Sequence, residues 1–180
     1  MDALAQQIAD YQNKFYTENG KNTFFKKAQK QQCAQTVCEN IGFEQLLKRT
    51  VYIVPNTSFV YFDYPIFKTY ATPAHYETIV DYVYMLANQC IQDKGVYEVH
   101  IDLSGFTISA CERYKNMITL FCTHCTNENL PCIEHINKLH IFNCPSVIDQ
   151  IANMVKNMIE PSIYSKTVLH SKKEGLPTYK

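Results

Sequence analysis

The sequence predicts an α/β domain built on a mainly parallel sheet of about five strands, covered by helices and preceded by a helical segment. Three apolar, strand-like runs occur in the second half of the chain, at 96–103, 138–144 and 165–170, and helical patterns separate them. Parallel strands need long crossovers, usually helices, so this alternation favours a parallel sheet. The first fifty residues instead carry apolar positions at three- and four-residue spacing, which is typical of helices.

Two helices are expected before the sheet. Leu4, Ile8, Tyr11 and Phe15 recur at helical spacing. A second helical run ends before Gly42, a residue type that commonly terminates helices. Its apolar positions are Phe24, Phe25, Ala28, Cys33, Val37 and Ile41. Residues 1–48 are therefore assigned to a helical N-terminal segment.

From residue 49 onward the composition changes, and the sequence predicts two short strands followed by a helix. The runs TVYIV and SFVYFDY are β-branched and aromatic, and the turn-forming residues at 55–58 separate them. From residue 72 to 91 the apolar positions fit one face of a helix, with Thr72 and Pro73 at its start and Gly95 after its end. These elements begin the main domain, assigned to 49–171, with a flexible tail at 172–180.

Two further helices are expected between the three later strands. The first has an apolar face of Ile108, Cys111, Ile118, Phe121, Cys122 and Cys125. The second spans residues 146–159 and has an apolar face of Val147, Ile148, Ile151, Met154, Val155, Met158 and Ile159. Methionine is flexible and polarisable, so a Met-containing face adapts to irregular partners as well as to an ordinary core.

The charge balance and the N-terminal residues limit the class of protein. Lys plus Arg equal Asp plus Glu at 17 each, so no global field attracts nucleic acid, and no nucleic-acid partner is expected. The chain shows neither a secretory leader pattern nor an apolar run of membrane-spanning length. The eight cysteines lie in periodic apolar segments, as reduced thiols do. We therefore expect a cytoplasmic protein, with any membrane contact peripheral.

The sequence IDLSGFTIS poses the main chemical question, since Asp102 follows an apolar strand and Gly105 marks a turn. A phosphate-transferring aspartate of the dehalogenase type needs a second Asp two residues later, where this chain has Ser104. A phosphate-binding loop needs more glycines and a Lys. The preferred interpretation is structural: Asp102 or Ser104 accepts hydrogen bonds from amides at the start of the next helix, and Gly105 supplies the turn.

A second group of reactive residues carries two interpretations. The spacing CxxC followed by CxxH could surround a zinc ion. Against this, the first pair continues the apolar stripe of a helix, and buried thiols are the preferred interpretation. The four candidate zinc ligands are Cys122, Cys125, Cys132 and His135. His100 and His140 are interpreted as ordinary sheet residues, and no catalytic residue is assigned, so the protein is not expected to be an enzyme.

An ordered set of short motifs resembles the CRAL-TRIO domain of phosphatidylinositol and retinal transfer proteins. In that family one strand ends in Asp-x-x-Gly, matched here by Asp102 and Gly105, and a later strand ends in Asn-x-Pro, matched by Asn143 and Pro145. A helix that ends near a proline then leads to Ser-Lys at the head of the last strand. The matching residues are Pro161, Ser165 and Lys166.

The resemblance implies non-enzymatic binding, and transfer, of a lipid or other small hydrophobic molecule in a slot beneath a movable gate helix at 146–159. No cofactor is implied other than a bound phospholipid. Lys166 would contact a headgroup phosphate, and a transient membrane surface and a protein would be further partners. The implied slot and gate residues are Val147, Ile148, Ile151, Met154, Val155, Met158, Phe121 and Ile118.

Two alternatives remain open at this point. The first is a protein-interaction scaffold of the same fold with no lipid cargo, binding a small GTPase or another partner. The second is an anti-sigma-antagonist-like domain, which also has an IDLSG-like strand; that family continues with a second Asp and a Gly, which are missing here, although Ser109 could take the place of its phosphorylated residue.

Overall fold

The computed structural model of the protein describes residues 3–125, 132–172 and 174–177. Its centre is a five-stranded sheet in which the spatial order of the strands follows the chain. Strand β1 pairs antiparallel with β2, and the other neighbours are parallel. The mainly parallel sheet predicted from sequence is therefore confirmed. The strands are β1 (Val51–Ile53), β2 (Phe59–Asp63), β3 (Tyr97–Asp102), β4 (Ile136–Phe142) and β5 (Thr167–Leu169).

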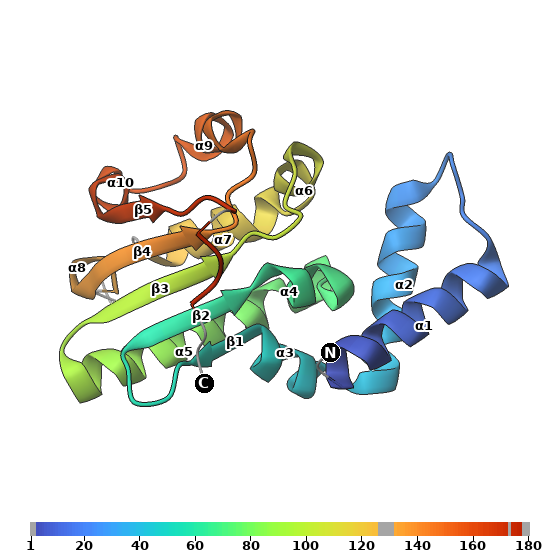
Figure 1. The fold of residues 1–180 in the computed structure, drawn as a ribbon, viewed down its shortest axis with the longest axis horizontal. Helices are drawn as coiled ribbons and strands as arrows, with labels where there is room; N and C mark the ends of the chain where they lie inside the picture. The colour runs from blue at the N-terminus through green and yellow to red at the C-terminus, as the bar shows by residue number, and fades with distance from the viewer. Residues whose placement is uncertain (1–2, 126–131, 173, 178–180) are drawn as a thin grey trace.

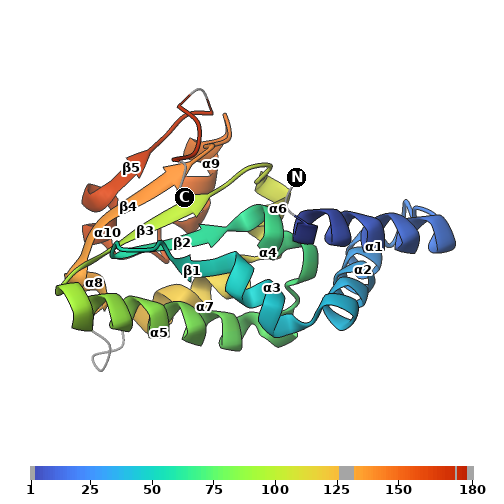
Figure 2. The same cartoon turned by 60° about the horizontal axis from the view of Figure 1, so that its bottom comes forward.

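The crossover helices lie on one face of this sheet, as Figure 2 shows for α5 and α7. Each parallel step moves in the same direction across the sheet, and right-handed crossovers then place their helices on the same side. The chain after β5 runs over the opposite face (Figure 1). The crossover helices are α5 (Tyr76–Lys94), α6 (Ile108–Arg113), α7 (Lys115–Cys125), α8 (Cys132–His135), α9 (Ile148–Val155) and α10 (Pro161–Lys166).

The N-terminal helices form a hairpin that projects beside the β1 end of the domain (Figure 1). Leu4 and Ile8 of the first helix and Val37 of the second join the main core, so the hairpin is attached at its base. The hairpin consists of α1 (Ala3–Asn19) and α2 (Lys26–Ile41). Helix α3 (Phe43–Thr50) leads into β1, and α4 (Tyr64–Tyr70) and the short 3-10 turn η1 (Pro73–His75) lie between β2 and α5. Gly42, with φ of 98°, ends α2 as the sequence indicated.

The main core lies between the sheet and α5. Val51 and Val60 of the first two strands and Ile79 and Val80 of α5 are at most 1% exposed. Alternation along the strands places Val60, Val99 and Leu139 on this covered face, and the register makes them lateral neighbours. The opposite face carries Tyr61, His100 and His140 in the same register row.

Several element boundaries differ from the sequence prediction. The helix expected after Gly105 is divided into α6 and α7, and the last strand begins at Thr167 because Ser165 and Lys166 still belong to α10. Helix α4 was missed, although Asp63 accepts a hydrogen bond from the Ile66 amide and Pro65 lies in the first turn. An N-cap Asp and a Pro in the first turn are typical of a helix start, but the aromatic residues around them favoured a strand prediction.

Candidate functional site

The Asp102 corner is a structural junction between two strands. Its buried carboxylate Oδ1 accepts hydrogen bonds from the Ser104 amide at 2.9 Å, the Ser104 hydroxyl at 2.7 Å and the Asn143 side-chain amide at 2.8 Å. Asn143 has a φ of 54° and Gly105 a φ of 74°. The two short motifs at the ends of β3 and β4 therefore meet through one carboxylate.

One detail of the predicted corner is wrong. The helix that follows starts with Thr107, whose hydroxyl accepts a hydrogen bond from the Ala110 amide at 3.2 Å, and neither Asp102 nor Ser104 caps it. Asp102 instead tightens its own turn through the Ser104 amide. The short Asp102 side chain lies two residues before the Ser104 amide, and this spacing favours the local turn bond over a bond to the more distant amides at the start of the helix.

The predicted gate segment forms a helix shorter than expected, because α9 ends at Val155 and residues 156–158 form a turn. Its buried residues Ile151 and Val155 pack with Cys111 in a small apolar cluster. This cluster is distinct from the main core that α5 covers. Partly buried apolar side chains complete it, and they are Phe106, Ile108, Ile118, Val147 and Ile159.

The other predicted gate and slot residues lie at different depths. Met154 is 38% exposed, whereas Ile148, Met158 and Phe121 are partly buried. The Thr119 hydroxyl lies 3.4 Å from the Met158 sulfur, which joins the end of the gate segment to α7. Phe121 packs against the main core and stacks on Tyr84 of α5. The gate segment thus lies over α6 and α7.

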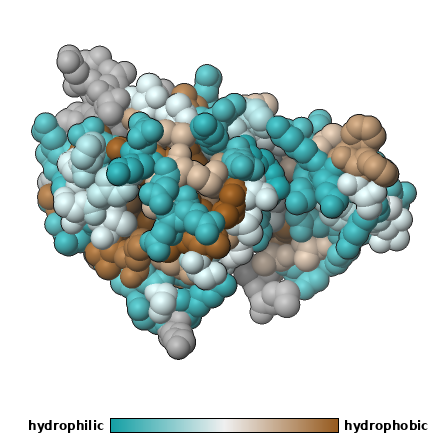
Figure 3. All heavy atoms as spheres, turned by 90° about the horizontal axis from the view of Figure 1, so that it is seen from above, coloured by the Kyte–Doolittle hydropathy of each residue, from teal (hydrophilic) through white to brown (hydrophobic). Residues whose placement is uncertain are grey.

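An apolar row on the covered face of the sheet remains incompletely buried. Ile101, Ile141 and Leu169 are lateral neighbours in the register of β3, β4 and β5. Ile101 and Ile141 are partly buried and Leu169 is 49% exposed, and none of the three belongs to either apolar cluster. We call these three residues the edge row. Figure 3, which looks onto α9, α10 and β5, shows apolar surface among polar side chains at this end.

Lys166 is held at the edge of the sheet on the α10 side. Its ammonium donates a hydrogen bond to the Ile133 carbonyl of α8 at 3.1 Å, and the side chain is partly buried. An ammonium has three donors, so this bond leaves further donors for a phosphate oxygen. The headgroup role of Lys166 stays a prediction.

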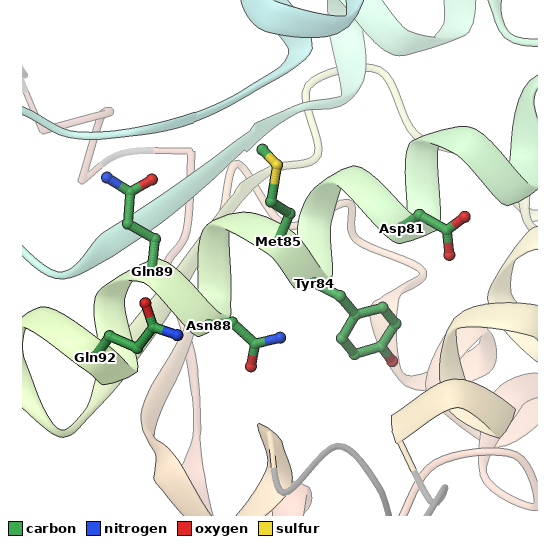
Figure 4. Close-up of a pocket in the computed structure, with 6 residues that line it drawn as sticks. All are labelled: Asp81, Tyr84, Met85, Asn88, Gln89 and Gln92. Atoms are coloured by element: carbon green, nitrogen blue, oxygen red, sulfur yellow. The ribbon is translucent and has the colours of Figure 1, made fainter.

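Two surface hollows lie away from the gate segment. One, shown in Figure 4, runs along the outer side of α5 and is lined by Asp81, Tyr84, Met85, Asn88, Gln89 and Gln92. The other lies between α2 and η1, where the Cys38 sulfur is 3.9 Å from the His75 ring. Burial raises the pKa of the Cys38 thiol and lowers the pKa of His75, and both shifts disfavour a thiolate–imidazolium pair.

The structure describes the side chains of only some of the candidate zinc ligands. The side chains of Cys125 and Cys132 lie outside the described residues, so the four-residue set stays a prediction. His135 donates a hydrogen bond from Nδ1 to the Gly95 carbonyl at 2.9 Å, since a carbonyl oxygen only accepts. Cys122 is partly buried at the end of α7.

The mainly parallel sheet with its covering helices defines a small α/β domain, and comparison with known proteins gives its family. Residues 56–179 match the family model of the CRAL/TRIO domain, which covers more than half of the chain. The chain therefore belongs to the CRAL/TRIO domain family, whose members bind lipids or other small hydrophobic molecules and are generally not enzymes. The anti-sigma-antagonist alternative is thereby set aside.

The solved structure of Sfh5 shows the same fold. It aligns with a TM-score of 0.58 at 14% sequence identity, over 97% of this chain and 68% of that one. No curated protein matches in sequence. Among the described residues, no helix is long and apolar enough to cross a membrane.

Proposed function

We propose that this chain binds one lipid or similar hydrophobic molecule between the gate segment and the edge row. The observation that supports this proposal is the edge row. Its three aliphatic side chains are neighbours on the covered face of the sheet, and the two apolar clusters leave them partly exposed. Covering half of each side chain with a hydrocarbon tail would contribute about 1 kcal/mol per residue. No charged side chain interrupts this row in the sheet register.

The small cluster beneath α9 suits a segment that moves. Opening α9 exposes Ile151 and Val155, at a cost of roughly 4–6 kcal/mol, while the main core stays intact. A ligand tail that replaces these contacts offsets the cost, since both sides of the exchange are apolar. Segments with few buried contacts open at lower free energy than the rest of a domain.

A charged headgroup would lie near Lys166, the last residue of α10 before the edge strand β5. The ammonium has donors beyond the one used on the Ile133 carbonyl, and an anionic phosphate would gain a charge-assisted hydrogen bond. This assignment predicts a preference for anionic over neutral phospholipids.

Membrane contact during exchange would use the turn between α1 and α2, where an apolar patch projects at the end of the hairpin (Figure 3). Phe24 and Phe25 are 91% and 71% exposed. The Asn22 side-chain oxygen accepts hydrogen bonds from both of their backbone amides at 2.9 Å, which fixes the turn. Lys26 and Lys27 follow directly and are exposed. Aromatic side chains beside lysines favour an anionic bilayer surface.

The test is lipid capture with a matched pair of variants. Organic extracts of the purified protein are analysed by mass spectrometry, and uptake of a fluorescent phospholipid is measured. Ile141→Asp places an unpaired carboxylate in the edge row and should weaken uptake by at least about 30-fold, equivalent to about 2 kcal/mol. Met154→Asp, on the exposed side of α9, should leave uptake within about twofold.

Thermal unfolding of both variants shows whether a loss of uptake reflects a loss of the fold. An extract without lipid, together with no uptake by the wild type, would overturn the proposal and favour the protein-interaction scaffold. Equal losses in the two variants would show that the ligand does not enter through the edge row.

A further inference from the structure

A group of three metal-binding side chains lies on the sheet face opposite the helices. In the register of the parallel strands His100 of β3 faces His140 of β4, and Glu98 lies two residues before His100 on the same face. The Glu98 Oε2 atom is 3.5 Å from Nε2 of each histidine. One ligand atom from each of the three residues lies within 4.8 Å of the others.

This spacing fits one small cation. A tetrahedral ion with ligands at about 2.1 Å has ligand atoms about 3.4 Å apart. The two carboxylate–imidazole distances already have that length, and a small ring rotation would bring the two imidazole nitrogens together. The side chains are 17% exposed for Glu98, 7% for His100 and 21% for His140, so the group is sheltered yet reachable from solvent.

Neighbouring hydrogen bonds fix how His140 presents its ring. Its Nδ1 is 2.9 Å from Nε2 of His170, whose Nδ1 is 3.0 Å from the Glu174 carboxylate. A carboxylate only accepts, so Nδ1 of His170 carries the proton and, in the neutral ring, Nε2 accepts from Nδ1–H of His140. The lone pair of a neutral His140 Nε2 then faces Glu98 Oε2, an opposition of two acceptors that either a proton on His140 or a bound cation relieves.

The remaining contacts also support ligation. Glu98 accepts a hydrogen bond from the Asn137 amide at 2.6 Å through Oε1, which leaves Oε2 directed at the histidines. His100 stacks on Phe59 at 4.5 Å between ring centres.

We propose that Glu98, His100 and His140 bind one divalent transition-metal ion of the zinc type on the sheet face opposite the crossover helices. Two imidazoles and one carboxylate suit zinc and its neighbours, whereas calcium and magnesium prefer oxygen ligands. His170 and Glu174 are positioning residues, which orient His140 as a carboxylate–histidine pair orients many metal ligands. The three ligands leave a fourth position for water. The site does not depend on lipid binding, since it lies on the other face.

Metal binding is measured on the full chain without a histidine tag, after treatment with a chelator and under reducing conditions. Zinc titration by calorimetry should give one ion per chain, and cobalt should give a tetrahedral visible spectrum without a sulfur-to-metal charge-transfer band. Glu98→Gln and His140→Ala should each weaken zinc binding by at least about 100-fold, and His170→Ala by about 10–100-fold. Glu77→Gln, the same change at an exposed carboxylate of α5, should have no effect.

Glu98→Gln keeps the shape of the side chain, so it decides the outcome if His140→Ala fails to fold. A wild-type affinity weaker than about 1 mM overturns the proposal. So does a cobalt spectrum with a thiolate band that disappears in the Cys122→Ala variant, because the metal would then lie on cysteines. Unchanged affinity in Glu98→Gln and His140→Ala also overturns it.

Discussion

Removal of the Asp102 carboxylate should destabilise the domain, because this group joins the ends of β3 and β4. Asp102 is 4% exposed, and its Oδ1 atom accepts three hydrogen bonds from Ser104 and Asn143. Asp102→Ala deletes all three and leaves the Ser104 amide and the Asn143 amide without this acceptor. Bonds to a charged acceptor are worth about 1.5–3 kcal/mol each, but both donors are only partly buried and regain some solvation.

The expected net loss is about 2–4 kcal/mol in the free energy of unfolding. For a chain of this length a loss of about 3 kcal/mol lowers the melting temperature by roughly 6–12 °C. Urea titration followed by circular dichroism, with calorimetry as a second probe, measures both quantities. Asp102→Asn keeps one acceptor oxygen and should lose less than the alanine variant.

A double-mutant cycle isolates the bond between the two strand ends. Asn143→Gly removes the donor while tolerating the φ of 54° at that position, so backbone strain does not confuse the result. The coupling energy between Asp102→Ala and Asn143→Gly should be about 1–2 kcal/mol. A coupling below about 0.3 kcal/mol, or a loss below about 1 kcal/mol for Asp102→Ala, would refute the junction role.

Three further outcomes are expected. The double variant Phe24→Ser, Phe25→Ser should reduce sedimentation with phosphatidylserine vesicles by at least about tenfold, because two exposed rings are lost from the bilayer contact. Thr23→Ser is the control. Unchanged binding of the double variant would exclude this turn from membrane contact. Lys166→Ala should weaken uptake of an anionic phosphoinositide while sparing a neutral phospholipid, and equal losses for both would remove its headgroup role. In chelator-treated protein the free energy of unfolding should fall as the pH drops below 6.5. Burial lowers the pKa of His100 and His140 in the folded state, so on acidification these histidines are protonated at a higher pH in the unfolded chain than in the folded one. The stability present above pH 6.5 is therefore lost towards acid, by at most about 1.4 kcal/mol per pH unit per histidine. A flat profile between pH 7 and pH 5 would contradict the shifts.

The candidate site shows where sequence reasoning succeeds and where it stops. Helical spacing correctly placed Ile151 and Val155 on the inner side of the gate segment. It gave Met154 the same role, yet that residue is 38% exposed, because a period of 3.6 does not say how wide the covered stripe is. The end of α9 at Val155 was also not predictable, since no glycine or proline marks it.

The Glu98, His100 and His140 group was missed for a different reason. Each histidine, taken singly inside a strand, was interpreted as an ordinary sheet residue. Alternation along the sequence does give the face of each side chain, but the pairing of β3 with β4 joins residues about forty positions apart. The contribution of His170 depends in addition on how the chain after β5 folds back over the sheet (Figure 1).

The sequence by itself determined the order of the strands, the mainly parallel sheet and the turns at Asp102 and Asn143, because these follow from local propensity, periodicity and the geometry of crossovers. Only the tertiary structure decided which side chains meet: the edge row that the two apolar clusters leave partly open, and the two imidazoles and the carboxylate on the opposite face. The physical reason is that lateral register and helix packing are set by contacts between distant segments, which one strand or helix does not encode.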